Sequence, residues 1–270
     1  MSSGTKSGGG RVFLVGGGWD GAVADVVYGA FLRAAAVRSG AGSAPRVLCV
    51  VVDEGDGGEQ FARYDVALRK VGACVPVPLL VPVGERVDVV AALSEDVDGV
   101  IVCGGLTPAY QEAFAGTGAS GSGSGAGSGV GLLASLLAER GVPYAGFSAG
   151  AAVAARDAVV GGWLVDGVAV CPGDAAEDLE EVEVRPGLGL VPFGVDVHAA
   201  QWGTLGRLVA VVAGGRLAHG VAIDENTVVE VGSGPLARVG GLGRAHCVRP
   251  APGGGVVVRS YGDGESFPVA

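Results

Sequence analysis

The segment 146–150 is GFSAG, which fits the G-x-S-x-G pattern of a serine nucleophile on a sharp strand-to-helix turn. Pro143 to Phe147 is predicted to be the strand before it, and the small residues after it favour a helix. Such a turn would expose the Ser148 hydroxyl, and the backbone N–H of Ala149 at the helix N-terminus would face a developing oxyanion. In so Gly- and Ala-rich a chain, a purely structural turn would also explain the pattern.

The chain has three histidines that could act as the base for Ser148. His219 precedes a predicted strand and His246 lies in a β-like run, so a structural role suits both. His198 comes directly after a predicted strand and enters a loop. We therefore predict that His198 takes the proton of Ser148.

A serine–histidine pair needs an acid that orients and stabilises the imidazole. We look for it between Ser148 and His198, where the acidic candidates are Asp157, Asp166, Asp174, Glu177, Asp178, Glu180 and Glu181. The run from Glu177 to Glu183 is typical of a solvated face. Asp166, in the loop after the β-like piece 158–164, is the acid we favour, with Asp174 and Glu177 as the alternatives.

Two glycine turns follow other predicted strands. Gly104-Gly105 comes after GVIVC, at the sheet edge where open α/β sheets bind ligands. The N–H of Gly105 could be a second oxyanion donor, although a plain strand-to-helix turn fits equally well. Gly16-Gly17-Gly18 does not complete a dinucleotide-binding motif, and Trp19 and Asp20 would crowd a phosphate there.

These turns belong to a regular alternation of apolar runs of strand length with segments that favour helices. The predicted strands are 11–15, 46–52, 75–80, 99–103 and 143–147, and the predicted helices are 22–38, 58–71, 86–94 and 131–140. Apolar strands separated by helices predict a mostly parallel, doubly wound sheet with helices on both faces, flavodoxin-like in type.

After Ser148, short β-like pieces replace this pattern, and they predict a partly antiparallel, β-rich C-terminal edge. They are 158–164, 189–193, 221–223, 227–231, 247–249 and 256–259, with a helix at 202–213. We expect one domain over 11–270, a disordered lead-in over 1–10, and a flexible Gly/Ser loop inserted at 116–129.

The composition of the chain argues against several classes of binding partner. The net charge is −10 without any basic run, which argues against nucleic acid and anionic membranes. No apolar run is long enough to span a bilayer, and the N-terminus lacks a signal-peptide layout. Five scattered cysteines without C-x-x-C spacing argue against structural zinc and disulfides. We expect a cytoplasmic protein with a small-molecule substrate.

Taken together, several segments resemble the cyanophycinase and aspartyl dipeptidase (peptidase E) family of serine peptidases. They extend from about Arg11 to Val231 and include RVFLVGGG, GVIVCGG, GFSAGAA followed by AVVGG, PGLGLVPFGVDVH, LGRL and GVAIDENT. Cyanophycinase is the closer match. The resemblance implies a class I glutamine-amidotransferase-like fold, often a homodimer, without metal or cofactor. It makes Ser148 the nucleophile, His198 its base and Asp166 the acid, with Gly105 and Ala149 as oxyanion donors.

The chain departs from this family where the substrate would bind. Leu106 replaces the Asn or Asp usual after the paired glycines, and Trp202 and Thr204 stand where arginines are expected. Arg207 is retained. We therefore expect Leu106, Gln201, Trp202 and Arg207 to contact the substrate, and we expect cyanophycin itself to be a poor one.

The residues and the resemblance together predict a peptidase or amide hydrolase that cleaves a small peptide or isopeptide through a Ser-His-acid acyl-enzyme mechanism. Two alternatives stay open. One is an α/β-hydrolase-type esterase, which shares the elbow and the chain order Ser, acid, His. The other is a catalytically inactive binding module of the same fold.

Overall fold

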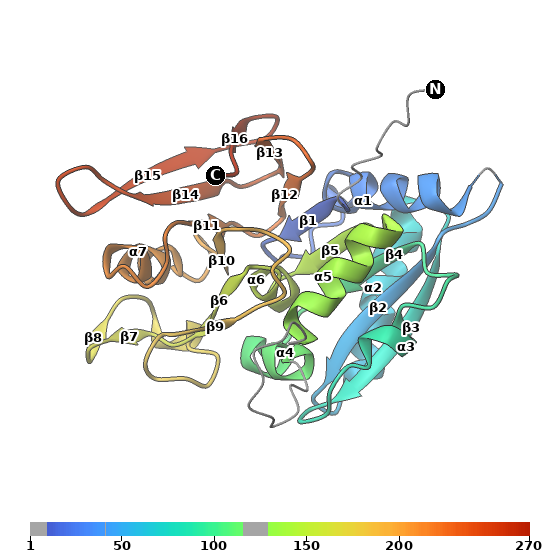
Figure 1. Cartoon of the computed structure of the whole chain (residues 1–270), viewed down its shortest axis with the longest axis horizontal. Coiled ribbons are helices and arrows are strands. Elements are labelled where there is room, and N and C mark those ends of the chain that lie inside the picture. Colours follow the sequence, from blue (N-terminus) through green and yellow to red (C-terminus); the bar gives the residue numbers. More distant parts are fainter. Residues whose placement is uncertain (1–9, 41, 116–128) are drawn as a thin grey trace.

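The computed structural model describes residues 10–40, 42–115 and 129–270. Its centre is an eight-stranded sheet (Figure 1). In spatial order the strands are β16 (Ser266–Pro268), β13 (Leu236–Gly241), β12 (Thr227–Val231), β1 (Val12–Val15), β5 (Tyr144–Phe147), β4 (Gly99–Val102), β2 (Arg46–Asp53) and β3 (Val75–Pro82). From β1 to β3 all neighbours are parallel, whereas β12, β13 and β16 add an antiparallel edge.

Helices cover both faces of this sheet because alternate strand residues point to opposite sides. Phe13, Val47 and Ile101 pack beneath α1 (Ala24–Ser39) and α2 (Gly57–Val71). Leu14, Leu48 and Val100 lie in the opposite core, which includes side chains of α3 (Val89–Ala92), α4 (Thr107–Phe114), α5 (Gly129–Arg140) and α6 (Ala149–Val153). The predicted doubly wound class, consistent with the class I glutamine-amidotransferase-like fold, is therefore confirmed.

A second, four-stranded sheet holds much of the C-terminal half. Its order is β10 (Gly194–Val197), β11 (Gly220–Ile223), β14 (Ala245–Pro250) and β15 (Val256–Tyr261). The helix α7 (Leu205–Ala213) packs on it through Leu208, Val211 and Val212. Only part of the C-terminal β structure therefore extends the main sheet, and the rest forms a sheet of its own.

Smaller β elements connect the two sheets. The strand β6 (Asp157–Gly161) pairs with β9 (Glu183–Pro186), and β7 (Leu164–Val165) pairs with β8 (Val168–Ala169). A short 3-10 helix, Gly173–Ala175, lies between β8 and β9.

Three local expectations need correction. The predicted helix 86–94 shortens to α3, where Asp88 caps the N-terminus. The predicted strand 189–193 is reduced to a single bridge between Val191 and Ala155, and the strand before His198 is β10 instead. Glu183, assigned to a solvated run, begins β9. The lead-in 1–10 and the loop 116–129 lie outside the described residues except for Gly10 and Gly129.

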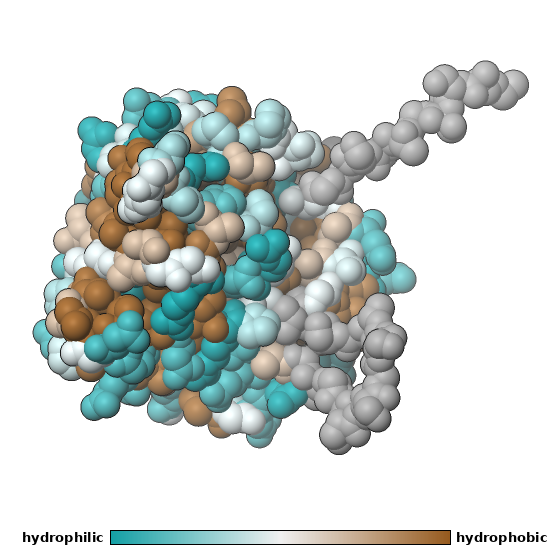
Figure 2. Space-filling view, turned by 60° about the vertical axis from the view of Figure 1, so that its left-hand side comes forward, coloured by the Kyte–Doolittle hydropathy of each residue, from teal (hydrophilic) through white to brown (hydrophobic). Residues whose placement is uncertain are grey.

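The surface mixes apolar and polar residues. On the face in Figure 2, brown apolar groups alternate with teal hydrophilic ones. Across the residues that the structure covers, none of the helices combines the length and the apolar character needed to cross a membrane.

Candidate active site

Ser148 occupies a strained turn between β5 and α6. Its backbone has φ 51° and ψ −113°, a region that residues other than glycine rarely adopt. A Cβ at Gly146 would lie 2.4 Å from the carbonyl oxygen of Gly150, and a Cβ at Gly150 would lie 2.1 Å from that of Val102. The two glycines of the GFSAG segment are therefore required for the chain to approach itself at this elbow.

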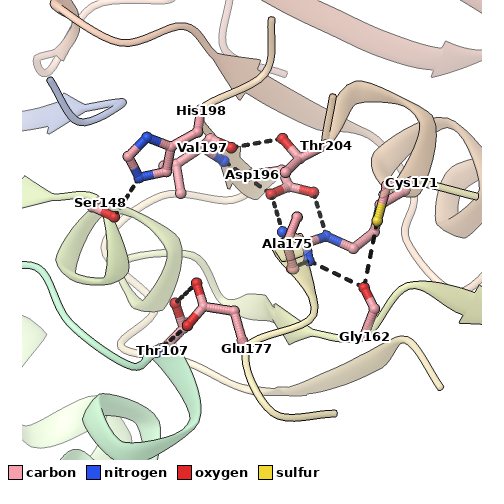
Figure 3. A network of polar contacts seen from close by, with 11 residues as sticks. Thr107, Ser148, Gly162, Cys171, Ala175, Glu177, Asp196, Val197, His198 and Thr204 are labelled. Atoms are coloured by element: carbon pink, nitrogen blue, oxygen red, sulfur yellow. Dashed lines mark hydrogen bonds and ion pairs between the residues drawn. The ribbon is translucent and has the colours of Figure 1, made fainter. Parts of the chain in front are cut away.

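The structure brings Ser148 and His198 together. The Ser148 Oγ lies 2.7 Å from the Nε2 of His198, and both side chains are buried (Figure 3). His198 follows β10 directly and has φ 55°. On one side, the Trp202 ring stacks on the imidazole at 3.8 Å between centroids, with an interplanar angle of 7°.

The glycine triplet after β1, Gly16 to Gly18, contacts His198 and leaves room for its ring. The carbonyl of Gly16 accepts a hydrogen bond from the His198 N–H at 3.0 Å. Gly17 lies against the ring, where an added Cβ would come within 2.1 Å of the imidazole Cε1. The triplet, which shows no dinucleotide motif in the sequence, is needed here because a side chain at Gly17 would displace the imidazole.

The acid beside His198 is Glu225, and the prediction of Asp166 is wrong. Glu225 Oε1 lies 2.7 Å from the His198 Nδ1, so the two ring nitrogens are taken by Ser148 and Glu225. Asp166 is exposed in the turn between β7 and β8, where its N–H donates to Glu181. The alternatives fail too, because Asp174 lies on the exposed 3-10 helix and Glu177 binds the N–H and hydroxyl of Thr107.

Glu225 lies beyond His198 in the sequence, outside the interval between Ser148 and His198 in which the acid was expected. The strands β10 and β11 are parallel neighbours, with Val197 opposite Ile223. Residues just beyond their carboxyl ends therefore lie close together, which places Glu225 near His198. This adjacency is a long-range pairing that the local sequence pattern does not encode.

Burial lowers the pKa of His198 below its ordinary value, while the hydrogen bond and the charge of Glu225 act in the opposite direction. The imidazole is therefore neutral at pH 7 and able to accept a proton. Gln201 holds Glu225 in place, because its side-chain oxygen accepts the Glu225 N–H at 2.9 Å. Gln201 thus supports the acid, and nothing in its described contacts aims it at a substrate.

The two backbone N–H groups predicted to be oxyanion donors belong to the turns after β5 and β4. Ala149 is the first residue of α6, and Gly105 lies in the turn between β4 and α4. Within the described residues, neither N–H donates to a protein acceptor, whereas the neighbouring N–H of Gly104 donates to the Tyr64 hydroxyl at 2.7 Å. Gly105 has φ 153°, and a Cβ there would lie 3.0 Å from the Tyr110 ring.

Arg207 cannot contact a substrate in the predicted way, because it is buried in an ion pair. Its Nε and Nη2 bind the carboxylate of Asp196 at 2.9 and 2.7 Å. Its Nη1 donates to the carbonyls of Gly162 and Ala175 at 3.1 and 2.7 Å. The charge of Asp196 raises the pKa of Arg207 although burial opposes this. Figure 3 shows how this network connects the strand before His198 with the segment around Ala175.

A cavity of about 670 Å³ opens over the Ser148–His198 pair. Leu106 and Trp202 line it, as predicted for residues that would meet a substrate. The aromatic ring of Trp19 lines it as well and packs on Phe147 and Tyr64 with centroids 4.7 and 4.9 Å away. Sequence reasoning assigned Trp19 no part in this site, because only the fold brings the β1 turn beside β5.

No protein-family model matches the sequence, and no curated protein matches it either. Solved structures do share the fold. One is a crystal structure of a peptidase from an acI-B1 Actinobacterium, with a TM-score of 0.65 and 16% identity over 97% of this chain and 98% of that one. Another is a protein provisionally assigned as a peptidase E from Listeria monocytogenes EGD-e, with a TM-score of 0.51 and 15% identity over 86% of this chain and 98% of that one. At these identities the likeness concerns the fold.

Proposed function

We propose that this chain is a serine-type hydrolase, a peptidase or amidase that cleaves a small peptide-like substrate. One observation carries the proposal. Ser148 Oγ, the two nitrogens of His198 and the Glu225 carboxylate form a continuous line of 2.7 Å contacts beside a cavity. The shared fold with two structures described as peptidases supports it.

In the proposed reaction, Ser148 attacks the scissile carbonyl while the neutral His198 takes its proton. Glu225 then stabilises the imidazolium, and the N–H groups of Gly105 and Ala149 bind the oxyanion. His198 returns the proton to the leaving amine, and water hydrolyses the acyl-enzyme by the same steps.

We still expect cyanophycin to be a poor substrate. Arg207 is engaged with Asp196, and the other arginines that could replace it pair elsewhere: Arg156 with Asp157, and Arg185 with Glu183 and Glu112. None of these three arginines lines the cavity. Among the described residues, Arg63 is the one arginine that lines the cavity. Carboxylates of a polyaspartyl chain would therefore find a single bidentate partner there.

The test is covalent labelling by a fluorophosphonate, followed by hydrolysis of matched amides and esters. Wild-type protein should be labelled at Ser148, and Ser148→Ala should lose the label and about 10⁴-fold or more of the activity. The exposed Ser94, changed to Ala, is the matched control and should behave as wild type. Turnover of esters without amides would indicate an esterase, and labelling without any turnover would indicate an inactive module.

A further inference from the structure

The cavity over Ser148 is lined by five carboxylates and one cationic side chain. The carboxylates are Glu54 and Asp56, from the loop between β2 and α2, and Asp174, Glu177 and Asp178, from the segment before β9. The cation is Arg63, whose guanidinium lies over the Trp19 ring at 5.8 Å. The cavity wall is therefore strongly acidic.

In the part of the chain that the structure describes, these carboxylates form no ion pairs. Where these carboxylates accept hydrogen bonds, the donors are uncharged. Asp56, for example, accepts a hydrogen bond from the side-chain amide of Gln60. Glu177 is mostly buried, whereas Glu54, Asp56, Asp174 and Asp178 are exposed on the cavity wall.

Two of the carboxylates lie next to the oxyanion turn. Glu54 accepts the N–H of Leu106 at 3.1 Å, one residue beyond Gly105. Glu177 accepts the N–H of Thr107 at 2.8 Å and the Thr107 hydroxyl at 3.1 Å. Each carboxylate oxygen keeps a second lone pair for another donor. Negative charge is thus held beside the turn that carries Gly105, the proposed oxyanion donor.

The segment that carries three of the carboxylates is held in an unusual conformation. Glu177 and Asp178 have φ 55° and 61°, which costs free energy for residues with a side chain. Arg207 fixes this segment from beneath through the carbonyl of Ala175. Burial raises the pKa of Glu177, although its bonds to Thr107 oppose the rise. A desolvated carboxylate held in place gains from a cation more than a mobile surface one does.

We infer that the substrate is a cationic amide or peptide, with an ammonium or guanidinium group near the scissile bond and no carboxylate beside it. This inference rests on the proposed function of Ser148 and His198. The acidic wall would bind the cation, and the rings of Trp19 and Trp202 on the same cavity add faces that attract cations. An anionic substrate would meet repulsion from five carboxylates and attraction from Arg63 alone.

The cation could be an N-terminal ammonium or a side-chain group, and one substrate series separates these sources. Lysyl aminomethylcoumarin amide is compared with its Nα-acetyl, its Nε-acetyl and its doubly acetylated forms, and with the glutamyl amide. A second series, Ala-Lys, Ala-norleucine and Ala-Glu amides, places the charge on the leaving side. We expect the cationic member of at least one series to have a kcat/KM roughly tenfold or more above its neutral match.

Charge-removing variants assign this preference to the cavity. The variant Glu54→Gln/Asp174→Asn/Asp178→Asn should lose most of the cationic preference, measured as the ratio of kcat/KM for the lysyl amide to that for its doubly acetylated form. Glu59→Gln/Glu85→Gln/Glu95→Gln removes the same three charges from exposed positions that do not line the cavity, and it should keep the preference. Raising the salt concentration should weaken the preference in the wild type, because salt screens exposed charges.

The outcomes separate this inference from the proposed function. Ser148-dependent hydrolysis in which neutral or glutamyl members of both series match the cationic ones would overturn the inference alone. Absence of labelling and of all turnover would overturn the proposed function. In that case, calorimetry with the Ser148→Ala variant still decides: tighter binding of lysyl amide than of its doubly acetylated form supports a cation site, and equal binding rejects it.

Discussion

His198 lies between the Ser148 hydroxyl and the Glu225 carboxylate, which are far apart in the sequence, and its environment sets its basicity. Burial lowers its pKa, and Glu225 partly restores it. Ser148 and His198 both have positive φ, at 51° and 55°, and each such residue costs about 1–3 kcal/mol. The fold maintains these strained backbones at the residues proposed for catalysis, which agrees with a functional role.

Glu225→Gln should lower kcat by roughly 10³- to 10⁴-fold, because the imidazolium formed during the reaction loses its carboxylate. The pH profile should also move. Glu225 raises the pKa of His198, so its replacement should lower that pKa further and shift the acid limb of kcat/KM to lower pH. Rates measured from pH 4 to 9 would show both effects.

Asp166→Asn is the matched control for this change, since Asp166 is exposed and does not contact His198. It should leave both kcat and the pH profile near those of the wild type. A large loss in Asp166→Asn with little effect in Glu225→Gln would reverse the assignment of the acid.

Gly17→Ala should reduce kcat/KM by about 10²-fold, as expected when a catalytic group is displaced by about 1 Å. The added Cβ would lie 2.1 Å from the His198 Cε1, so the imidazole must move away from Ser148. Gly84→Ala is the control, because Gly84 also has a positive φ but nothing lies within 4 Å of its Cβ position. Equal activity in the two variants would mean that the ring tolerates the methyl group.

At the scale of elements, the strands and helices of the N-terminal half could be predicted, because continuous apolar runs and helical segments alternate there. The elbow strand β5 and the helix after it followed from the same pattern. The contacts between distant elements could not be predicted. Glu225 meets His198 because β10 and β11 are adjacent, and Arg207 on α7 meets Asp196 on β10. A charged residue on a short helix does not reveal whether it faces the cavity or the core.

Arg207→Met should destabilise the protein by about 3–5 kcal/mol, because it leaves Asp196 as a buried, unpaired carboxylate. The double variant Arg207→Met/Asp196→Asn should recover part of this loss, since the unpaired charge is gone. Urea denaturation measures both. A stable Arg207→Met variant with a raised KM would instead restore Arg207 as a substrate-binding residue.

At the scale of the whole molecule, the proposed site lies where the two sheets meet. Ser148 follows β5 of the large sheet, His198 follows β10 of the small one, and Glu225 lies in the connection from β11 to β12, which links them. One hydrophobic core joins the sheets, since Leu14 and Val100 share a cluster with Val197 and Ile223. The alternation of apolar runs with helical segments predicted an α/β protein. The division of its β-rich half into two sheets depends on long-range pairing that local patterns do not encode.

This shared core predicts that both sheets unfold together and that the site is lost in the same transition. Far-UV circular dichroism, tryptophan fluorescence and fluorophosphonate labelling should give one common midpoint in urea. Leu208→Ala creates a cavity in the fully buried core beneath α7 and should shift all three midpoints together, by the equivalent of about 2–5 kcal/mol. Val37→Ala, on the exposed face of α1, should shift none of them, because that side chain is 85% exposed. A different result would be loss of labelling in Leu208→Ala at a urea concentration where most of the circular dichroism signal is still present. The two sheets would then be separate cooperative units, and the geometry between Ser148 and His198 would depend on their docking.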